Sequence, residues 1–312
     1  MRPNHVRHLC ILAALCAALC LLPRPSVAAE EPSPLWQPLI DRLAEDGLPR
    51  DYLDKLFSRP EITFQPRVMS RKMIALLRSK TAPATPPSKE APSAPRVYER
   101  YLQPALLADA LRFMDDNRAT LDKVEQERGV SREVVVAIML VETRLGSYLG
   151  NGNAFVSLAS MALCDDFLLV QAYMPMNSLS PQLQQWLVRR TRQKADWAYE
   201  ELVAFIEYAM ASGQDPLNIR SSPYGAIGLC QFMPSNAVRF GVDGNNDGVV
   251  DLFDPADALP SIANYLAFHG WKPGLTEERQ ERVIYHYNHD ETYARTIVEL
   301  SKKLKEMEGA RN

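Results

Sequence analysis

The stretch that decides the fold covers residues 134–146 and reads VVVAIMLVETRLG. It is an almost unbroken apolar run of helical length, with Ser131 before it as a candidate N-cap and Gly146 after it as a stop signal. An apolar helix without a polar face is normally buried on all sides. We therefore expect a central helix in the core of a mainly α protein.

One carboxylate, Glu142, stands near the end of this run. We expect it to project from the core into a cavity at the C-terminal end of the helix. Apolar surroundings and the negative end of the helix dipole both disfavour the ionised form, so the pKa of Glu142 should be raised. A carboxyl group that stays protonated near neutral pH can act as a general acid. The alternative is a solvated Glu142 in the last helical turn, paired with a nearby arginine.

The N-terminal residues are typical of a targeting segment. Arg2 and Arg7 precede an apolar run from Leu9 to Leu22, and residues 27–29 are small enough for a cleavage site. This run is short for a membrane span. We expect residues 1–29 to be a removed signal peptide; an uncleaved leader would instead tether the protein to a membrane.

Composition and charge are those of an ordinary globular protein. Of the 312 residues, 46% are hydrophobic and 23% are charged, with a formal net charge of −3. Loss of the leader, which holds three arginines and no acid, would make the charge −6. Such an acidic chain lacks the net positive charge that is typical of proteins that bind nucleic acid. Cys164 and Cys230 would remain, either as a disulfide in an oxidising compartment or as two buried free thiols.

Helical periodicity recurs along the chain. Two or three short amphipathic segments are expected between Leu35 and Leu77, followed by an extended linker at residues 81–95, which contain five prolines. A long helix is expected from about Tyr98 to Arg128, closed by Gly129. Beyond the central stretch, further helices are expected at about Pro181–Ala211, Ala256–Phe268, Thr276–Asn288 and Glu291–Glu308. No strand alternation is evident beyond a possible short pair, and the mature chain has no internal repeat or membrane-spanning run.

A calcium loop is predicted at residues 243–254, which read DGNNDGVVDLFD. Oxygen-bearing side chains occupy positions 1, 3, 5, 9 and 12 of this twelve-residue segment, with glycine at position 6. A saturated oxygen cage would make the metal structural, and the shorter Asp254 at position 12 would weaken binding. The alternative is a polar turn rich in Asp and Asn. The predicted ligands are Asp243, Asn245, Asp247, the Val249 carbonyl, Asp251 and Asp254.

Residues 221–255 form a loop zone rich in Gly, Asn, Asp and Pro. Within it, Gly225 and Gly228 would let the backbone approach a ligand closely, and Gln231 offers both a donor and an acceptor. A separate cluster of His286, His289 and Asp290 could bind zinc in principle. No further ligands are suggested there, and isolated histidines usually pack or form hydrogen bonds.

Several short motifs, taken in order, are similar to one family. They are VETR at 141–144, GAIG at 225–228, QFMPS at 231–235, DPADA at 254–258, ANYL at 263–266, HGW at 269–271 and YN at 287–288. This order and spacing resemble the lytic murein transglycosylases of the membrane-bound B type, from about Leu35 to the end of the chain. Departures occur at Leu145, where the family commonly has an aromatic residue, at residues 223–224 and 229–230, and over residues 164–190.

The resemblance implies a lysozyme-like helical catalytic domain at residues 98–312, with the calcium loop at 243–254. An additional N-terminal helical segment at 30–79 and a Pro-rich linker or loop at 80–97 would precede it. Peptidoglycan glycan strands would be the partner, the periplasm the location, and a monomer the expected state.

The resemblance also implies a reaction. The β-1,4 bond between N-acetylmuramic acid and N-acetylglucosamine would be cleaved with Glu142 as acid and then as base. The sugar's own C6 hydroxyl would attack and close a 1,6-anhydro ring, so no second carboxylate is needed. Ser222 and Asn288 would orient substrate groups, and Tyr224, Gln231 and Tyr287 would line the cleft.

Two other functions remain open at this point. One is a muramidase that uses water as the nucleophile. The other is a non-catalytic, calcium-stabilised peptidoglycan-binding protein. A calcium-dependent interaction domain of the dockerin kind is disfavoured because only one loop of this type is present.

Overall fold

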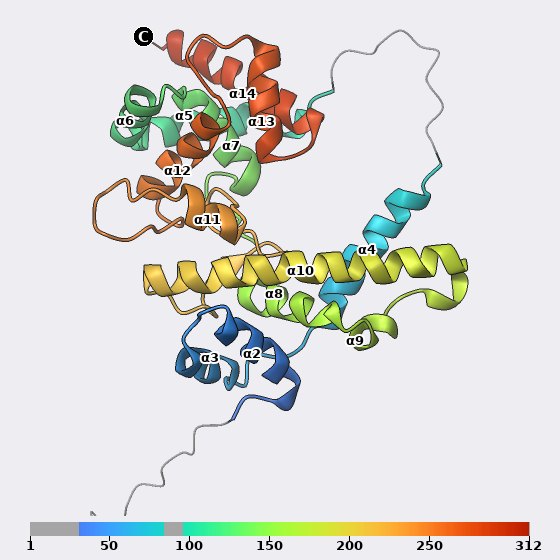
Figure 1. The fold of residues 1–312 in the computed structure, drawn as a ribbon. Helices are drawn as coiled ribbons and strands as arrows, with labels where there is room; N and C mark the ends of the chain where they lie inside the picture. Colours follow the sequence, from blue (N-terminus) through green and yellow to red (C-terminus); the bar gives the residue numbers. More distant parts are fainter. Residues whose placement is uncertain (1–30, 84–95, 312) are drawn as a thin grey trace, which may run out of the picture. The chain divides into compact units, whose positions relative to one another are not determined.

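The computed structural model describes residues 31–83 and 96–311, which form a mainly helical protein (Figure 1). The predicted signal peptide therefore lies outside the described residues, as does most of the predicted linker. The described chain forms two compact units, residues 31–62 and residues 63–311. The division into an N-terminal segment, a linker and a catalytic domain stays a prediction. Among the described helices, none is long and apolar enough to cross a membrane.

The first unit is a small helical hairpin. Apolar residues at helical spacing face inward from both of its α-helices, including Ile40 and Leu43 from one and Leu53 from the other. Trp36 and Phe57 close this core, with their ring centroids 5.4 Å apart. Its elements are η1 (Pro34–Trp36), α2 (Gln37–Glu45) and α3 (Arg50–Phe57).

The second unit holds the remaining elements. Its α-helices are α4 (Pro66–Thr81), α5 (Pro104–Asp116), α6 (Arg118–Arg128), α7 (Arg132–Thr143), α8 (Ala154–Ala162), α9 (Leu168–Gln171), α10 (Pro181–Ser212), α11 (Pro234–Phe240), α12 (Pro255–Phe268), α13 (Glu277–Tyr287) and α14 (Glu291–Gly309). Its shorter elements are η2 (Glu99–Tyr101), η3 (Leu163–Asp165), η4 (Met176–Ser178), β1 (Gly152–Asn153) and β2 (Arg220–Ser221).

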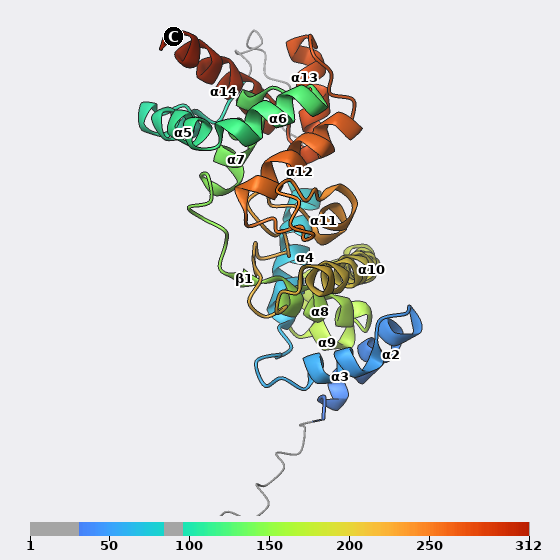
Figure 2. The ribbon, with the colours of Figure 1, turned by 90° about the vertical axis from the view of Figure 1, so that its left-hand side faces the viewer.

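Helix α7 is the centre of one helical layer, as the sequence predicts. Every residue from Val134 to Leu140 is buried, and α5, α6, α12 and α14 pack around the helix (Figure 2). Each of its three consecutive valines disfavours a helix by roughly half a kcal/mol. Burial of each valine contributes about 1.5 to 3 kcal/mol, so packing decides its conformation. Ser131 takes the N-cap position, although its side chain makes no capping hydrogen bond.

The long helix α10 organises a second layer. It packs against α8, α4 and α11, and α11 in turn contacts α12 of the first layer (Figure 1). Helix α8 is buried along its whole length and was not predicted. The predicted helices at the positions of α10, α12, α13 and α14 are confirmed to within a few residues.

The predicted long helix from Tyr98 to Arg128 is wrong in one respect. The chain forms η2, α5 and α6 instead, with a break at Asn117 between the last two. The Asn117 amide donates to the Phe113 carbonyl, at 2.9 Å. This local bond offers the backbone an alternative to continuing the helix. Gly129 closes α6 in the left-handed conformation, as predicted.

A two-residue antiparallel pair ties two distant loops together. Gly152 of β1 pairs with Ser221 of β2, and isolated bridges join Ser221 to Ile227 and Ile227 to Phe232. The segment that leaves α7 is thereby fixed against the glycine-containing loop. Cys164 and Cys230 are both buried and free, so the disulfide left open by the sequence does not form.

Candidate active site

Glu142 lies in the last turn of α7, half-buried. The helix ends at Thr143, before the predicted stop at Gly146, because Arg144 and Leu145 already adopt left-handed φ values of 50° and 57°. Such conformations cost non-glycine residues about 1–3 kcal/mol each and persist only where surrounding structure holds them. Here the Leu145 N–H donates to the Met139 carbonyl, at 3.2 Å. The strained turn leaves Glu142 at the very end of the buried helix.

Tyr293 of α14 holds the carboxyl group. Its hydroxyl donates to Glu142 Oε1, at 2.7 Å, and its own side chain is buried. Burial raises the pKa of Glu142 to about 7, while the Tyr293 hydrogen bond opposes part of that rise. The raised pKa is as predicted, and no arginine pairs with Glu142 among the described residues. Near neutral pH this group can therefore both give and take a proton.

The Tyr293→Phe variant should shift the pH profile of activity. Loss of the hydrogen bond that favours the ionised form raises the pKa of Glu142 further. The alkaline limb of kcat/KM, where Glu142 loses its proton, should then move to higher pH than in the wild type. Tyr285→Phe, at an exposed tyrosine of α13, is the matched control. An alkaline limb that stays in place would contradict this role for Tyr293.

Within residues 31–83 and 96–311, no second carboxylate accompanies Glu142. The other buried carboxylate of α7, Glu133, lies nine residues earlier at the opposite end of the helix. That separation is about 13 Å along the axis. Paired carboxylates in glycosidases lie roughly 5–9.5 Å apart. Among the described residues, burial and the Tyr293 hydrogen bond account for the shifted pKa of Glu142, and no other carboxylate contributes to it.

Thr143, the neighbour of Glu142, clamps the glycine-containing loop to the end of α7. It is fully buried, and its hydroxyl donates to the Leu229 carbonyl at 3.0 Å and accepts the Gly146 N–H at 3.1 Å. Gly228 has a φ of 73°, and a Cβ there would meet Leu252 Cβ at 2.6 Å. The absence of a side chain at Gly228 therefore leaves room for Leu252 of the protein itself. The sequence had predicted that the space would serve the close approach of a ligand.

Tyr287 and the loop at residues 228–231 meet beside Glu142. The Tyr287 hydroxyl donates to the Cys230 carbonyl, at 2.5 Å. The charge of Glu142 contributes to raising the pKa of both Tyr287 and the Cys230 thiol, which places the three groups close together. Phe232 and Tyr265 pack against the Tyr287 ring, at centroid distances of 5.7 and 5.1 Å. An aromatic cluster thus supports this side of the site.

None of the other predicted substrate-binding residues forms a hydrogen bond with Glu142 in the described chain. Ser222 Oγ accepts the Ala226 N–H at 3.0 Å and so shapes the loop. Gln231 donates to the Gly228 carbonyl of its own loop, at 3.0 Å. Tyr224 lies beneath the ammonium group of Lys72, and Asn288 is exposed at the end of α13. Their roles toward a ligand stay predictions.

In the first half of the predicted calcium loop, side-chain oxygens gather around the same turn of backbone. Asp243 accepts the N–H groups of Asp247 and Gly248, at 3.1 and 2.8 Å, and Asn245 Oδ1 also accepts the Asp247 N–H, at 3.0 Å. The carboxylates of the second half form hydrogen bonds with other groups. Asp251 Oδ1 accepts from Gln214, and Asp254 caps α12 through the Ala256 N–H. Within the described chain, no three His, Cys, Asp or Glu residues lie as a metal-holding group.

Asp257, whose role the sequence did not predict, anchors the predicted calcium loop. It is fully buried, and its two carboxylate oxygens accept the N–H groups of Gly244 and Asp251, at 2.8 and 2.7 Å. Burial raises the pKa of Asp257, and these hydrogen bonds oppose the rise. One side chain thus fastens both ends of the loop to α12.

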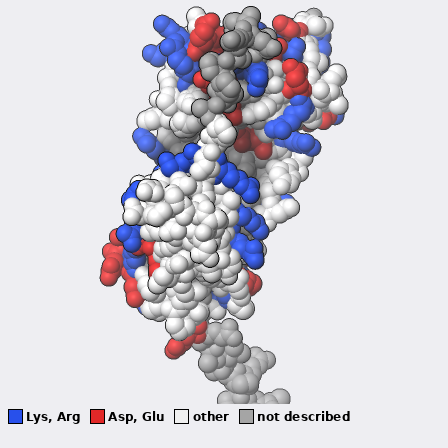
Figure 3. Space-filling view, turned by 90° about the vertical axis from the view of Figure 1, so that its right-hand side faces the viewer, with Lys and Arg blue, Asp and Glu red and all other residues white. Residues whose placement is uncertain are grey.

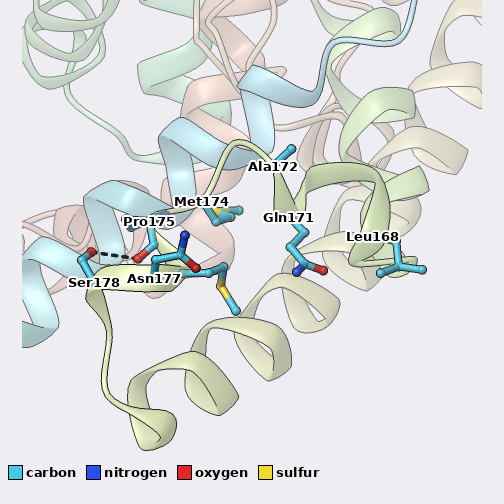
Figure 4. Close-up of a pocket in the computed structure, with 8 residues that line it drawn as sticks. Leu168, Gln171, Ala172, Met174, Pro175, Asn177 and Ser178 are labelled. Carbon is cyan, nitrogen blue, oxygen red and sulfur yellow. Dashed lines mark hydrogen bonds between the residues drawn. The ribbon is translucent and has the colours of Figure 1, made fainter.

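A separate hollow of about 530 Å³ lies in the segment between α9 and α10 (Figure 4). The Ser178 hydroxyl there donates to the Pro175 carbonyl, at 2.9 Å. None of the lining side chains ionises near neutral pH, so this hollow offers no acid–base chemistry. It is lined by Leu168, Gln171, Ala172, Met174, Pro175, Met176, Asn177 and Ser178.

Known proteins are similar to this chain in sequence and in fold. The chain is 27% identical over 248 residues to membrane-bound lytic murein transglycosylase B of Escherichia coli, a match that covers 78% of this chain and 59% of that relative. Its fold matches the Escherichia coli lytic transglycosylase Slt35 in complex with calcium, with a TM-score of 0.65 and 20% identity over 92% of this chain and 99% of the other.

A second solved structure is SltB3 from Pseudomonas aeruginosa in complex with NAG-anhNAM-pentapeptide. It has a TM-score of 0.62 and 18% identity, covering 86% of this chain and 78% of the other. The lysozyme-like fold expected from the sequence motifs is thereby confirmed. The model of the family described as the transglycosylase SLT domain matches residues 32–281. Because that match spans most of the length of this chain, the chain belongs to the transglycosylase SLT domain family.

Proposed function

We propose that this protein is a peptidoglycan lytic transglycosylase that cleaves the bond between N-acetylmuramic acid and N-acetylglucosamine. One observation carries the proposal: Glu142 is a half-buried carboxyl group without a neighbouring carboxylate in the described part of the chain, and its pKa is raised to about 7. Family membership and the relatives that bear this activity in their names support it. A relative with NAG-anhNAM-pentapeptide bound supports the anhydro product.

The first step breaks the glycosidic bond. Protonated Glu142 donates its proton to the bridging oxygen, and the electron pair of the bond from C1 to that oxygen leaves with N-acetylglucosamine. The Tyr293 hydroxyl, 2.7 Å from Oε1, orients the carboxyl group and stabilises the carboxylate that remains. Donors placed where charge develops in this way favour the transition state over the ground state.

The second step closes the ring. The C6 hydroxyl of N-acetylmuramic acid attacks C1, and its proton passes to the Glu142 carboxylate. One C–O bond has formed for the one broken, no water is consumed, and Glu142 is protonated again. A nucleophile within the same sugar gains from proximity, which offsets the absence of a second carboxylate.

Product mass separates this reaction from that of a muramidase. Cell-wall glycan digested by the protein should give anhydro ends, which are lighter by one water than the reducing ends made by hydrolysis. Reducing ends alone would establish the water-using reaction. Sedimentation of the protein with the insoluble wall, without release of any soluble fragment, would establish the non-catalytic binding protein.

Calcium is proposed as a structural ligand of residues 243–254. Asp243, Asn245, Asp247 and the Val249 carbonyl would hold it, because the first three already gather at one turn. Asp251 and Asp254 would have to leave their present partners to complete the set. The bound ion would stabilise the loop and would take no part in the bond cleavage. The relative crystallised with calcium supports this assignment.

Chelation should therefore destabilise the protein. A chelator should lower the Tm and added calcium should restore it, by about 2 to 4 °C for each kcal/mol of binding free energy. Asp247→Asn should reduce this response, while magnesium, which demands a tighter octahedral site, should substitute poorly. A Tm that is indifferent to both chelator and calcium would remove the metal from the proposal.

The periplasm is the proposed location, because peptidoglycan lies there and the N-terminal residues are typical of an export signal. The proposed partners are peptidoglycan glycan strands, with the protein acting as a monomer.

A further inference from the structure

Three cations of the second unit lie together without an acidic partner. Lys72 of α4 and Arg190 and Lys194 of α10 are all half-buried, and none pairs with an acid among the described residues. Arg190 donates to the neutral amide of Gln193, at 2.9 Å. Surface cations normally face water or an acid, so a half-buried unpaired set is unusual.

The two helices offer these cations no compensating charge, and the nearby Asp165 of η3 pairs with the exposed Arg192, at 3.1 Å. Helix α4 contains no acidic residue, and α10 contains none before Asp196. Figure 3 shows Lys and Arg side chains gathered on the face where these two helices lie. The pKa of Lys72 is lowered by burial and then by Arg190, and the pKa of Lys194 by burial, Lys72 and Arg190. The three groups therefore repel one another in the free protein, and an anion among them would relieve that repulsion.

The cluster adjoins the loop that reaches Glu142. Lys72 Nζ lies 4.4 Å from the centroid of the Tyr224 ring. Tyr224 belongs to the same loop as Cys230. The Cys230 carbonyl accepts a hydrogen bond from the Tyr287 hydroxyl, close to Glu142. Lys194 Nζ similarly lies 4.6 Å from the centroid of Trp197. Two of the three cations thus lie against aromatic rings, and one of those rings belongs to the loop that reaches Glu142.

We propose that Lys72, Arg190 and Lys194 form a subsite for carboxylates of the peptide carried by the glycan substrate. This inference rests on the proposed function, since the muramic acid side of the scissile bond bears that peptide in peptidoglycan. A half-buried group of ammonium and guanidinium donors suits a small anion such as a carboxylate. A membrane surface would instead be met by exposed, protruding cations.

The test compares two substrates with the full chain. Peptide-bearing glycan strands and strands stripped of peptide by an amidase are digested by the wild type and by the Arg190→Gln/Lys194→Gln variant. The ratio of kcat/KM for peptide-bearing over stripped strands should fall about ten- to hundredfold in the variant, mainly through KM. Arg189→Gln, at the exposed neighbouring arginine, is the control and should leave the ratio unchanged.

Each outcome supports or overturns the subsite. An unchanged ratio in the double variant overturns it, as does an equal loss on both substrates. Loss of binding to phosphatidylglycerol vesicles together with an unchanged ratio would overturn it in favour of a membrane contact. Absence of cleavage of either strand by the wild type would defeat the proposed function itself. In that case, weaker binding of the peptide-bearing strands alone by the double variant would still support the subsite.

Discussion

Glu142→Gln should lose nearly all cleavage of peptidoglycan while retaining its fold. Removal of a group that serves as both acid and base is expected to lower kcat by roughly a hundred- to ten-thousandfold. Glutamine keeps the size of the side chain and can still accept the Tyr293 hydroxyl, so glycan binding should survive. Release of soluble fragments and sedimentation with insoluble wall measure the two properties separately. Substantial cleavage by this variant would remove Glu142 from the mechanism.

The stability of this variant provides an internal control. The folded-state pKa of Glu142, about 7, lies above its ordinary value of 4.5. Between these values the unfolded chain releases the proton more readily than the folded chain, so ionisation costs stability as pH rises. Glu142→Gln should therefore unfold at a higher temperature than the wild type at about pH 8, and at a similar temperature below about pH 4. Lost activity in a protein of equal or greater stability cannot be ascribed to unfolding.

Gly228→Ala should strongly destabilise the protein. Its Cβ would lie 2.6 Å from Leu252 Cβ and 2.7 Å from the Leu252 carbonyl oxygen, where the Leu229 N–H donates at 2.8 Å. Backbone must move, and the residue must also hold a φ of 73°. We expect a loss of about 2 to 5 kcal/mol in the free energy of unfolding. Activity should fall as well, because the displaced loop carries the carbonyls that bind Thr143 and Tyr287.

Urea denaturation measures this loss through the midpoint at an unchanged slope. Gly274→Ala is the matched control, since Gly274 has a φ of 77° with open space at the Cβ position. It should lose only about 1 kcal/mol, from backbone conformation alone. Equal losses in the two variants would show that the close approach to Leu252 is unimportant.

The sequence predicted the helix that carries Glu142 because its cause is local. An apolar run such as Val134–Leu140 can be stable only when buried, whatever its neighbours. The glycine-flanked ends of α6 and α10 were likewise predictable, since Gly129 and Gly213 adopt the left-handed conformation that closes a helix. The break at Asn117 was missed because asparagine is tolerated inside helices as well as at their ends.

Tyr293, Asp257 and the cation cluster were missed for a different reason. Tyr293 lies 151 residues away in the chain, and in sequence it is one apolar position on the amphipathic α14. Asp257 looks like an ordinary acid in the first turn of α12, yet it is fully buried under the calcium loop. Lys72 and Lys194 come from helices far apart in sequence. Such pairings arise from packing between elements, which residue spacing does not report.

The central claim is that Glu142 alone serves both steps and that the nucleophile comes from the sugar. Digestion of cell-wall glycan in water labelled with heavy oxygen, followed by mass spectrometry of the products, tests it most directly. We predict anhydro ends without the label, since no water enters the product. Reducing ends that carry one labelled oxygen for each bond cleaved would contradict the account.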